Sequence, residues 1–216
     1  MKKIVYLDPG HGGHDPGALG PSGVKESDMA LDVCIRAKRM LSPYVDCRLT
    51  RSKDVFLSLS TRPAKANNDN ADLFISYHFN SASGPAKGFE IFTTPGQNYS
   101  DNLATILFKK QGEILPDQKQ RADTADGDPD KEASFSVIRG TKCPSCLMEG
   151  EFIHTPEGEA FITNPLNREK MAEVIMRGVL EYLEISKGAN FKKPVIDTEP
   201  QLNIEQRVAR LESIVL

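Results

Sequence analysis

IVYLDPGHGGHDPGALG, residues 4–20, joins a short apolar run to a segment rich in glycine and proline. The apolar run, residues 4–8, has the composition of a buried β-strand that begins almost at the N-terminus. Glycine and proline then end the strand, and two histidines, His11 and His14, lie in the loop that follows. Such a loop is typical either of a backbone cradle for an anion or of a site where histidine binds a metal.

Strand-like and helix-like segments alternate after this stretch, up to about residue 187. In residues 26–41, Met29, Val33 and Met40 recur at helical spacing, which predicts an amphipathic helix. We predict further strands at 45–50, 73–78, 88–93, 134–138 and 145–149, and further helices at 58–68, 102–114 and 168–185. This alternation predicts an α/β fold with a single open, mostly parallel twisted sheet flanked by helices.

Size and charge narrow the class of protein. The 216 residues fit one domain with a short appendage, and a domain of this size buries roughly 70% of its unfolded surface. It therefore needs neither a metal nor a disulfide merely to fold. The net charge of −3 argues against a nucleic-acid partner, which calls for a basic surface.

The hydropathy pattern indicates whether the chain crosses a membrane or carries a signal peptide. No apolar run approaches the roughly 18 residues of a membrane span, so we expect no membrane insertion. The first residues, MKKIVYLDPG, lack the apolar stretch of a signal peptide. We therefore expect synthesis in the cytoplasm, and any action outside the membrane then requires another exit route.

Two segments resemble binding sites without completing one. Cys143 and Cys146 have CxxC spacing, but Cys34 and Cys47 form no second pair, so we predict buried or incidental thiols. The polar segment 116–131 contains DGDPD at 126–130, where a calcium loop is conceivable. Because the EF-hand spacing is absent, we predict a solvated loop there.

The composition changes after residue 187. Residues 188–203 lack periodicity and contain two prolines, which predicts a linker. In 204–216, apolar residues recur at steps of four, three and four, which predicts a short amphipathic, coiled-coil-like helix. That helix either docks on its own domain or joins copies of the chain. We favour a homo-oligomer, because the linker lets the helix leave its domain.

Four chemically active side chains lie at the ends of predicted elements. His11 follows the first strand, His78 and Glu149 each close another, and Glu26 begins the first long helix. In an open α/β sheet, ligands bind beyond the carboxyl ends of the strands, so these groups can converge at one edge. Strand formation itself calls for no charged group or imidazole at these positions.

Two imidazoles and one carboxylate are a ligand set of catalytic zinc, with a fourth position left for water. A further carboxylate then serves as general base, which together predicts a metal-dependent hydrolase. Each group also has an ordinary explanation, since histidine occurs in turns and Glu26 suits the first turn of a helix. The phosphate-loop alternative weakens, because GxxxxGK[ST] is absent from residues 7–20.

Several ordered motifs resemble one family. LDPGHGGHDPGA, then Glu26 before a helix, then SYHFNS, then CLMEGEFIHTPEGE, are similar to the zinc-dependent N-acetylmuramoyl-L-alanine amidases, the amidase type 3 family. The resemblance covers about residues 3–184. It implies that residues 1–187 form a zinc amidase catalytic domain. Those enzymes cleave the amide between the lactyl group of N-acetylmuramic acid and L-alanine in bacterial peptidoglycan.

The resemblance also implies roles for particular residues. One Zn²⁺ per domain is expected on His11, Glu26 and His78, with Glu149 as the catalytic base. The substrate-binding candidates are Asn80, Glu151 and His14.

These candidates differ in how they match the motifs. Asn80 matches a motif position, whereas His14 occupies a variable one and is expected at the rim. Glu151 stands where the family usually has glycine, and strand alternation puts it on the same side as the base two residues earlier. Arg62 is expected to serve structure, and Phe79 to add an apolar wall to the groove.

The expected partner is bacterial peptidoglycan. A chain without an export signal suits a phage endolysin that reaches the wall through holin-type pores; the alternative is a bacterial autolysin or sporulation amidase. Oligomerisation through 204–216 would let several catalytic domains bind the wall together. Two further alternatives are a zinc hydrolase of another amide and a wall-binding protein without activity.

Overall fold

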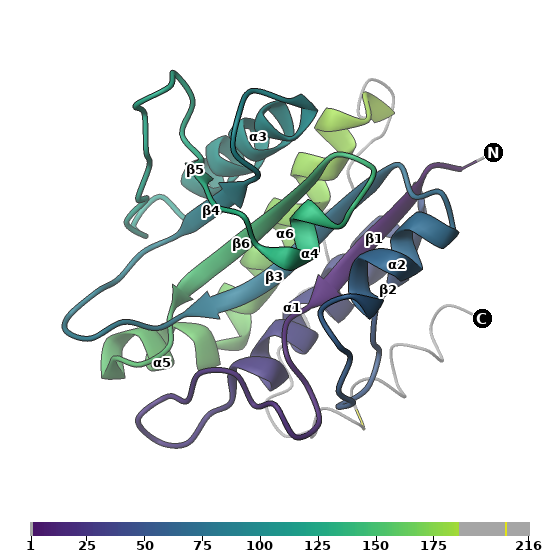
Figure 1. Cartoon of the computed structure of the whole chain (residues 1–216). Helices are drawn as coiled ribbons and strands as arrows, with labels where there is room; N and C mark the ends of the chain where they lie inside the picture. The colour runs from purple at the N-terminus through teal and green to yellow at the C-terminus, as the bar shows by residue number, and fades with distance from the viewer. Residues whose placement is uncertain (1, 186–205, 207–216) are drawn as a thin grey trace.

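The structure is a computed structural model that describes residues 2–185 and residue 206 (Figure 1). The predicted linker at 188–203 and, apart from Gln206, the predicted helix at 204–216 lie outside the described residues.

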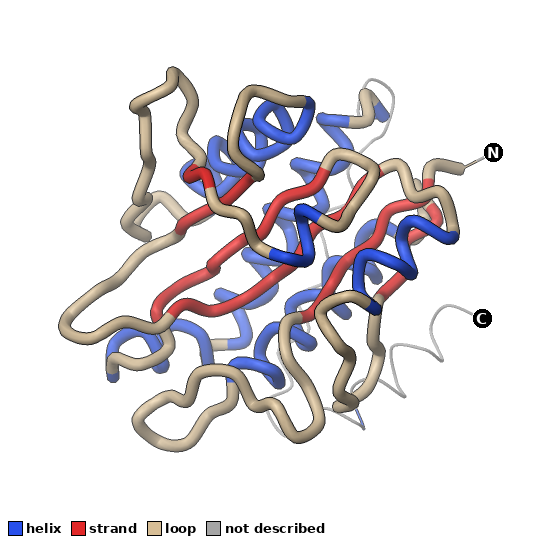
Figure 2. The backbone as a smooth tube through the Cα atoms, in the orientation of Figure 1, coloured by secondary structure: helices blue, strands red, loops and turns tan. Residues whose placement is uncertain are grey.

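One sheet of six strands runs through the described part of the chain (Figure 2). Its strands are β1 (Ile4–Pro9), β2 (Asp46–Leu49), β3 (Leu73–Asn80), β4 (Glu90–Thr93), β5 (Lys131–Glu132) and β6 (Ser145–Phe152). Their order across the sheet is β2-β1-β3-β6-β4-β5. All neighbouring pairs are parallel except β4 and β6, which are antiparallel. The predicted fold class is therefore confirmed.

Helices cover both faces of the sheet. The long helices α1 (Glu26–Leu41), α3 (Tyr99–Ile114) and α6 (Pro165–Tyr182) pack together behind the sheet in Figure 1. The shorter α2 (Thr61–Asn68) and α4 (Ser136–Arg139) lie in front of it, and α5 (Pro156–Thr163) precedes α6. No helix among the described residues has both the length and the apolar character needed to cross a bilayer.

β1 shows why the central strands are apolar throughout. Val5 and Leu7 belong to the large core under the long helices, whereas Tyr6 belongs to the smaller core on the other face. Successive strand residues point to opposite faces, so a strand covered on both sides needs apolar residues at every position. The continuous run at residues 4–7 predicted this arrangement correctly.

Buried ion pairs join α1 to α6. Arg36 Nε donates to Asp32 at 3.0 Å within α1, and Arg36 also pairs with Glu169 of α6. Arg168 of α6 also pairs with Asp32 of α1. Because buried charges need partners at fixed positions, these contacts set how the two helices lie against each other.

Two local predictions need correction. The strand predicted at 134–138 is wrong: Ser136–Arg139 form α4, whose Val137 and Ile138 pack in the smaller core. A short apolar run fits either element, and here contact with the sheet face decided. Part of the predicted solvated loop is buried, since Asp130 is only 3% exposed and β5 follows it directly.

The cysteine prediction is confirmed. All four thiols are free, with three buried and Cys143 half-buried. Burial raises the pKa of Cys143 to about 11, so its thiol stays protonated at neutral pH. These residues pack as small apolar side chains.

Candidate metal centre

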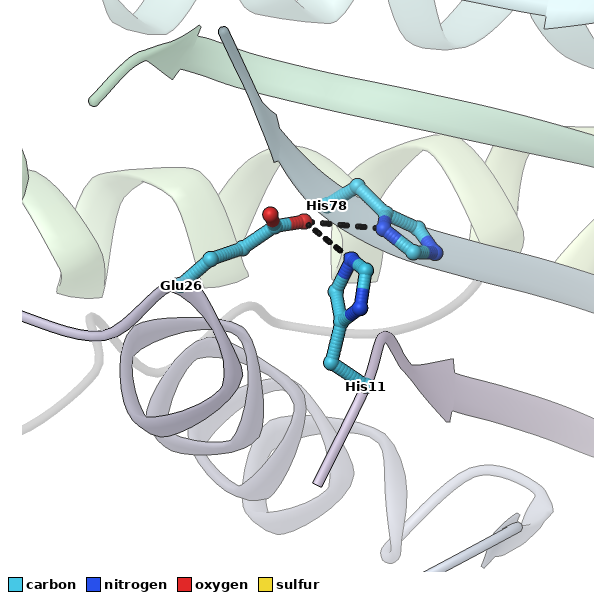
Figure 3. A group of neighbouring side chains, drawn as sticks. All are labelled: His11, Glu26 and His78. Atoms are coloured by element: carbon cyan, nitrogen blue, oxygen red, sulfur yellow. Dashed lines mark hydrogen bonds and ion pairs between the residues drawn. The ribbon is translucent and has the colours of Figure 1, made fainter. Parts of the chain in front are cut away.

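Three side chains converge beyond the carboxyl ends of β1 and β3 (Figure 3). His11 lies in the loop after β1, Glu26 is the first residue of α1, and His78 lies near the end of β3. Glu26 Oε1 is 3.1 Å from His11 Nε2 and 2.9 Å from His78 Nδ1. One ligand atom from each residue lies within 4.8 Å of the others, so the group can hold a metal ion.

The backbone at His11 is held in an uncommon conformation. His11 has φ 57°, in the left-handed region that costs energy for a residue with a side chain. The guanidinium of Arg62 fixes this turn, donating to His11 O at 2.7 Å and to Pro9 O at 2.7 Å. Arg62 also donates to the buried Asp8 carboxylate at 3.0 Å. These contacts match the structural role expected for Arg62.

Neighbouring groups orient the three side chains. The Asp15 carboxylate lies 2.9 Å from His11 Nδ1, which leaves Nε2 of that ring facing Glu26. The backbone N–H of Phe79 donates to Glu26 Oε1 at 3.1 Å, and that of Ala18 donates to Oε2 at 2.9 Å. Such supporting contacts are typical of metal ligands, whose rings and carboxylates are held by a second set of residues.

Electrostatics favour an ionised carboxylate at Glu26. Burial alone would raise the pKa of Glu26, but hydrogen bonds and charges of His11 and His78 outweigh it and hold the pKa well below its usual range. For His11, burial lowers the pKa, and the carboxylates of Glu26 and Asp15 more than compensate, so its pKa is raised. A carboxylate between two imidazoles provides the negative charge and the nitrogen donors that suit a divalent cation.

Glu149 lies beside this group on β6. Its Cα pairs with that of His78 on one side and with that of Glu90 on the other. Its Oε2 is enclosed and has no hydrogen-bond partner among the described residues. Burial raises the pKa of Glu149 well above its usual range, and the charges of Glu26 and Glu90 add to that effect. The carboxyl is therefore placed to carry a proton beside the three converging side chains.

Asn80 contacts a second carboxylate instead of the three converging side chains. Its Nδ2 donates to Glu90 Oε2 at 2.7 Å. Glu90 is buried and also accepts from Arg121 and Lys131, each at 2.6 Å. Asn80 therefore belongs to a charged network at the rim of the site.

The strand register explains the surroundings of Glu151. His78 pairs with Glu149, but two residues later Asn80 pairs with Phe152, so β6 carries one extra residue. The alternation expected of an unbroken strand does not hold across such a bulge. Glu151 Oε2 accepts from Gln118 Nε2 at 2.9 Å, and its Oε1 accepts from the backbone. These contacts support structure; substrate contact by Glu151 stays a prediction.

Two aromatic contacts show where the structure places His14 and Phe79. The His14 ring packs on Phe56 with centroids 4.1 Å apart, which attaches the Gly-rich loop to the loop after β2. Phe79 is only 1% exposed and packs against Tyr77 in the large core. The expected apolar wall at Phe79 is therefore wrong, because this side chain is buried beneath the site.

Two residues that support the site were not predicted from the sequence. Asp15 follows His11 by four residues, and this spacing places a carboxylate within reach of the imidazole across the tight turn. Glu90 interrupts the apolar strand GFEIFT, and a lone carboxylate in such a strand was the available sign. Neither role was assigned from sequence, since the partner of each residue depends on the folded loop.

Comparison with known proteins gives a consistent result. The family model for N-acetylmuramoyl-L-alanine amidase matches residues 5–181. The chain is 35% identical to an endolysin of Bacillus phage SPP1 over 205 residues, covering 93% of this chain and 73% of that protein.

Two bacterial proteins are similar as well. A sporulation-specific N-acetylmuramoyl-L-alanine amidase of Bacillus subtilis is 33% identical over 192 residues, covering 88% of this chain and 69% of that protein. The crystal structure of an N-acetylmuramoyl-L-alanine amidase from Clostridium difficile 630 superposes with a TM-score of 0.78. It is 30% identical and covers 87% of this chain and 99% of its own.

Proposed function

The chain belongs to the N-acetylmuramoyl-L-alanine amidase family, and from this premise we propose that His11, Glu26 and His78 bind one Zn²⁺ beside Glu149. The protein is a peptidoglycan hydrolase, which cleaves the amide between N-acetylmuramic acid and L-alanine of the stem peptide. The observation that carries the zinc site is the convergence of three donor atoms within 4.8 Å from separate parts of the chain.

The donor set favours zinc over harder cations. Catalytic zinc sites commonly use three protein ligands from histidine and carboxylate, whereas calcium and magnesium prefer oxygen ligands throughout. Two imidazole nitrogens and one carboxylate match the first pattern. When bound, Zn²⁺ supplies a Lewis acid that polarises the scissile carbonyl and acidifies water.

The chain's own residues supply positioning and proton transfer. Asp15 holds the imidazole of His11, and the backbone at Phe79 holds the carboxylate of Glu26. In this proposal the unpartnered oxygen of Glu149 accepts a proton from the attacking water, and burial, which favours the protonated carboxyl, helps Glu149 to hold that proton. The same carboxyl returns that proton to the departing nitrogen of L-alanine, as a general base that becomes a general acid.

Metal analysis and product analysis test this proposal together. Purified protein should contain one zinc per chain, lose activity to a chelator and regain it when Zn²⁺ is added. Digestion of purified peptidoglycan should release new N-terminal L-alanine. Release of reducing sugar instead would indicate a glycosidase and contradict the assignment. Failure to cleave peptidoglycan while cleaving other amides would favour the alternative of a different amide hydrolase.

Two variants separate the roles. His11→Ala should lose both zinc and activity, because it removes a ligand. Glu149→Gln should keep zinc and lose turnover, because an amide cannot accept the proton. Full activity in either variant would refute its role, and it would revive the alternative of a wall-binding protein.

For the biological role, we propose host lysis by a phage endolysin. The support is the similarity to the SPP1 endolysin, which extends over 93% of this chain. The alternative, a bacterial autolysin or sporulation amidase, is supported by the Bacillus subtilis relative. Expression with and without a holin separates them: an endolysin lyses the cell rapidly only when the holin is present. Synthesis in the cytoplasm and holin-type release stay predictions.

We also propose roles for Asn80, for His14 and for the segment 204–216. Asn80 and His14 would contact the bulky polymer at the rim of the site, so replacing either should raise KM while leaving zinc content unchanged. Oligomerisation through 204–216 concerns a segment that, apart from Gln206, lies outside the described residues. Light scattering at micromolar concentration tests it, and a monomeric mass would contradict it.

A further inference from the structure

The carboxyls of Asp128 and Asp130 lie together near the end of the polar segment 116–131. Asp130 is 3% exposed and Asp128 is half-buried, and their carboxyls lie within hydrogen-bonding distance of each other. Oδ1 of each residue is enclosed and accepts a hydrogen bond from no N–H or O–H group among the described residues. Buried polar atoms in folded proteins nearly always have a partner, so this pair calls for one.

The available donors serve the other oxygens of the pair. Thr93 Oγ1 donates to Asp130 Oδ2 at 2.5 Å. Gln97 Nε2 donates to Asp128 Oδ2 at 3.1 Å and to Asp126 Oδ2 at 3.2 Å. Both Oδ1 atoms are themselves enclosed by protein, and no donor among the described residues reaches them.

No cation of the described residues neutralises the pair. Lys131, the nearest lysine in sequence, pairs with Glu90 at 2.6 Å, and no Lys, Arg or His in the described part forms an ion pair with Asp128 or Asp130. The charge of Asp101 adds to the negative potential. Two like charges about 4 Å apart repel by roughly 4 kcal/mol near a protein surface, so either a proton or a cation is required.

We propose that Oδ1 of Asp128 and Oδ1 of Asp130 bind a divalent cation of the calcium class. Hard cations take carboxylate and other oxygen ligands, and this pair offers oxygen alone. The site therefore differs in chemistry from the group of His11, Glu26 and His78, whose nitrogen donors suit zinc.

The position of the pair indicates a structural role for this cation. Thr93 ends β4, and β4 runs antiparallel to β6 with Glu90 opposite Glu149. Thr93 therefore lies toward the end of the sheet opposite the zinc site. A cation at the pair would attach the loop before β5 to the edge strands β4 and β5, which lie together in Figure 1. Binding should raise stability without being needed for zinc binding.

Calcium titration of the full chain tests the site. The protein is freed of metal on a chelating resin, reloaded with one equivalent of Zn²⁺, and titrated with Ca²⁺ by calorimetry. We expect one Ca²⁺ per chain and a melting temperature that rises with Ca²⁺ concentration, since a ligand of the native state stabilises it. Asp130→Asn should weaken Ca²⁺ binding at least about tenfold, because affinity depends on the charge of the ligands.

Two further variants make the result specific. Asp128→Asn should weaken Ca²⁺ binding to a similar extent, and it provides a second test if Asp130→Asn does not fold. Asp117→Asn, an exposed aspartate of the same segment, is the matched control and should bind Ca²⁺ as the wild type does. Zinc content should be equal in all four proteins.

Either of two results would overturn the proposal. Wild-type protein that binds no Ca²⁺ and shows no change in melting temperature would mean that the pair shares a proton. Burial and the neighbouring Asp128 raise the pKa of Asp130 to about 7, so stability would then change with pH in that range and not in Asp130→Asn. Unchanged Ca²⁺ affinity in both pair variants would place any bound calcium elsewhere.

Discussion

Replacing Gly10 with alanine tests whether the metal centre depends on the close approach of the loop after β1 to His78. Gly10 follows β1 directly, and its backbone N–H donates to Tyr77 O at 3.0 Å, which brings the loop against β3. A Cβ at this position would lie 2.5 Å from His78 Nδ1 and 2.7 Å from Nε2. Glycine is thus required here by the space taken by a neighbouring imidazole.

The expected size of the effect follows from these distances. Carbon and nitrogen atoms in ordinary contact are about 3.5 Å apart, so the ring or the loop must move by about 1 Å. Ligand distances in metal sites tolerate only about 0.2 Å, so a ring displaced this far no longer binds in place. We expect zinc affinity to fall by at least about 10–100-fold, the loss typical of disturbed supporting contacts. Overpacking should also cost about 1–3 kcal/mol of unfolding free energy without metal.

Zinc titration against a competing chelator, with denaturant unfolding of the metal-free protein, measures both effects. Gly112→Ala is the matched control, because its Cβ would meet only the end of the Gln120 side chain, 2.9 Å from Oε1. Gly112 lies within α3, so this control should be near neutral or more stable by about 0.5–1 kcal/mol. Wild-type zinc affinity in Gly10→Ala would refute the reasoning, since it would show that His78 need not occupy its observed position.

Three further predictions concern proton transfer, the buried ion pair and pH. Glu149→Gln should lower kcat by about 10²–10⁴-fold at unchanged zinc content, measured by release of N-terminal L-alanine; a smaller loss would assign the base elsewhere. Arg62→Leu should cost about 3–5 kcal/mol in denaturant unfolding, because it leaves the buried Asp8 carboxylate without a cation, and Asp8→Asn in the same chain should restore part of the loss. Burial and the hydrogen bond to Asp69 raise the pKa of Tyr6 from 10.0 to about 12. The native state then holds this proton more tightly, so the contribution to stability is complete below pH 10 and is lost as pH rises toward 12. Tyr6→Phe should remove that part of the pH dependence, and an unchanged slope would contradict the assignment.

The candidate site was predictable because its residues are out of place as strand and helix formers. His78 and Glu149 each close a strand predicted from the sequence, and His11 follows a third, so the rule that ligands bind beyond the carboxyl ends of parallel strands placed them at one edge. Glu26 required the family resemblance, because a glutamate in a first helical turn has an ordinary explanation. The partners of these residues were not predictable, since Asp15 reaches His11 only through the conformation of the loop.

The predictions that need correction depend on contacts that only the folded chain makes. Residues 134–138 carry a short apolar run without a period, and contact with the sheet made part of it the helix α4. For Glu151, the extra residue in β6 between Glu149 and Phe152 means that strand alternation alone does not establish which side it faces, and its contact with substrate stays a prediction. Asp130 belongs to a polar, acidic segment, yet packing against Thr93 buries it.

Apolar periodicity and strand-end chemistry in the sequence determined the α/β class, the parallel sheet and the residues that converge. Both are local properties, because a strand buried on two faces must be apolar throughout and a ligand must project beyond it. The tertiary structure decided which atom faces which: the Glu26 carboxylate between two imidazoles, the unpartnered oxygen of Glu149, and the paired carboxyls of Asp128 and Asp130. Such contacts join segments far apart in the chain or depend on how a loop closes, so no spacing in the sequence specifies them.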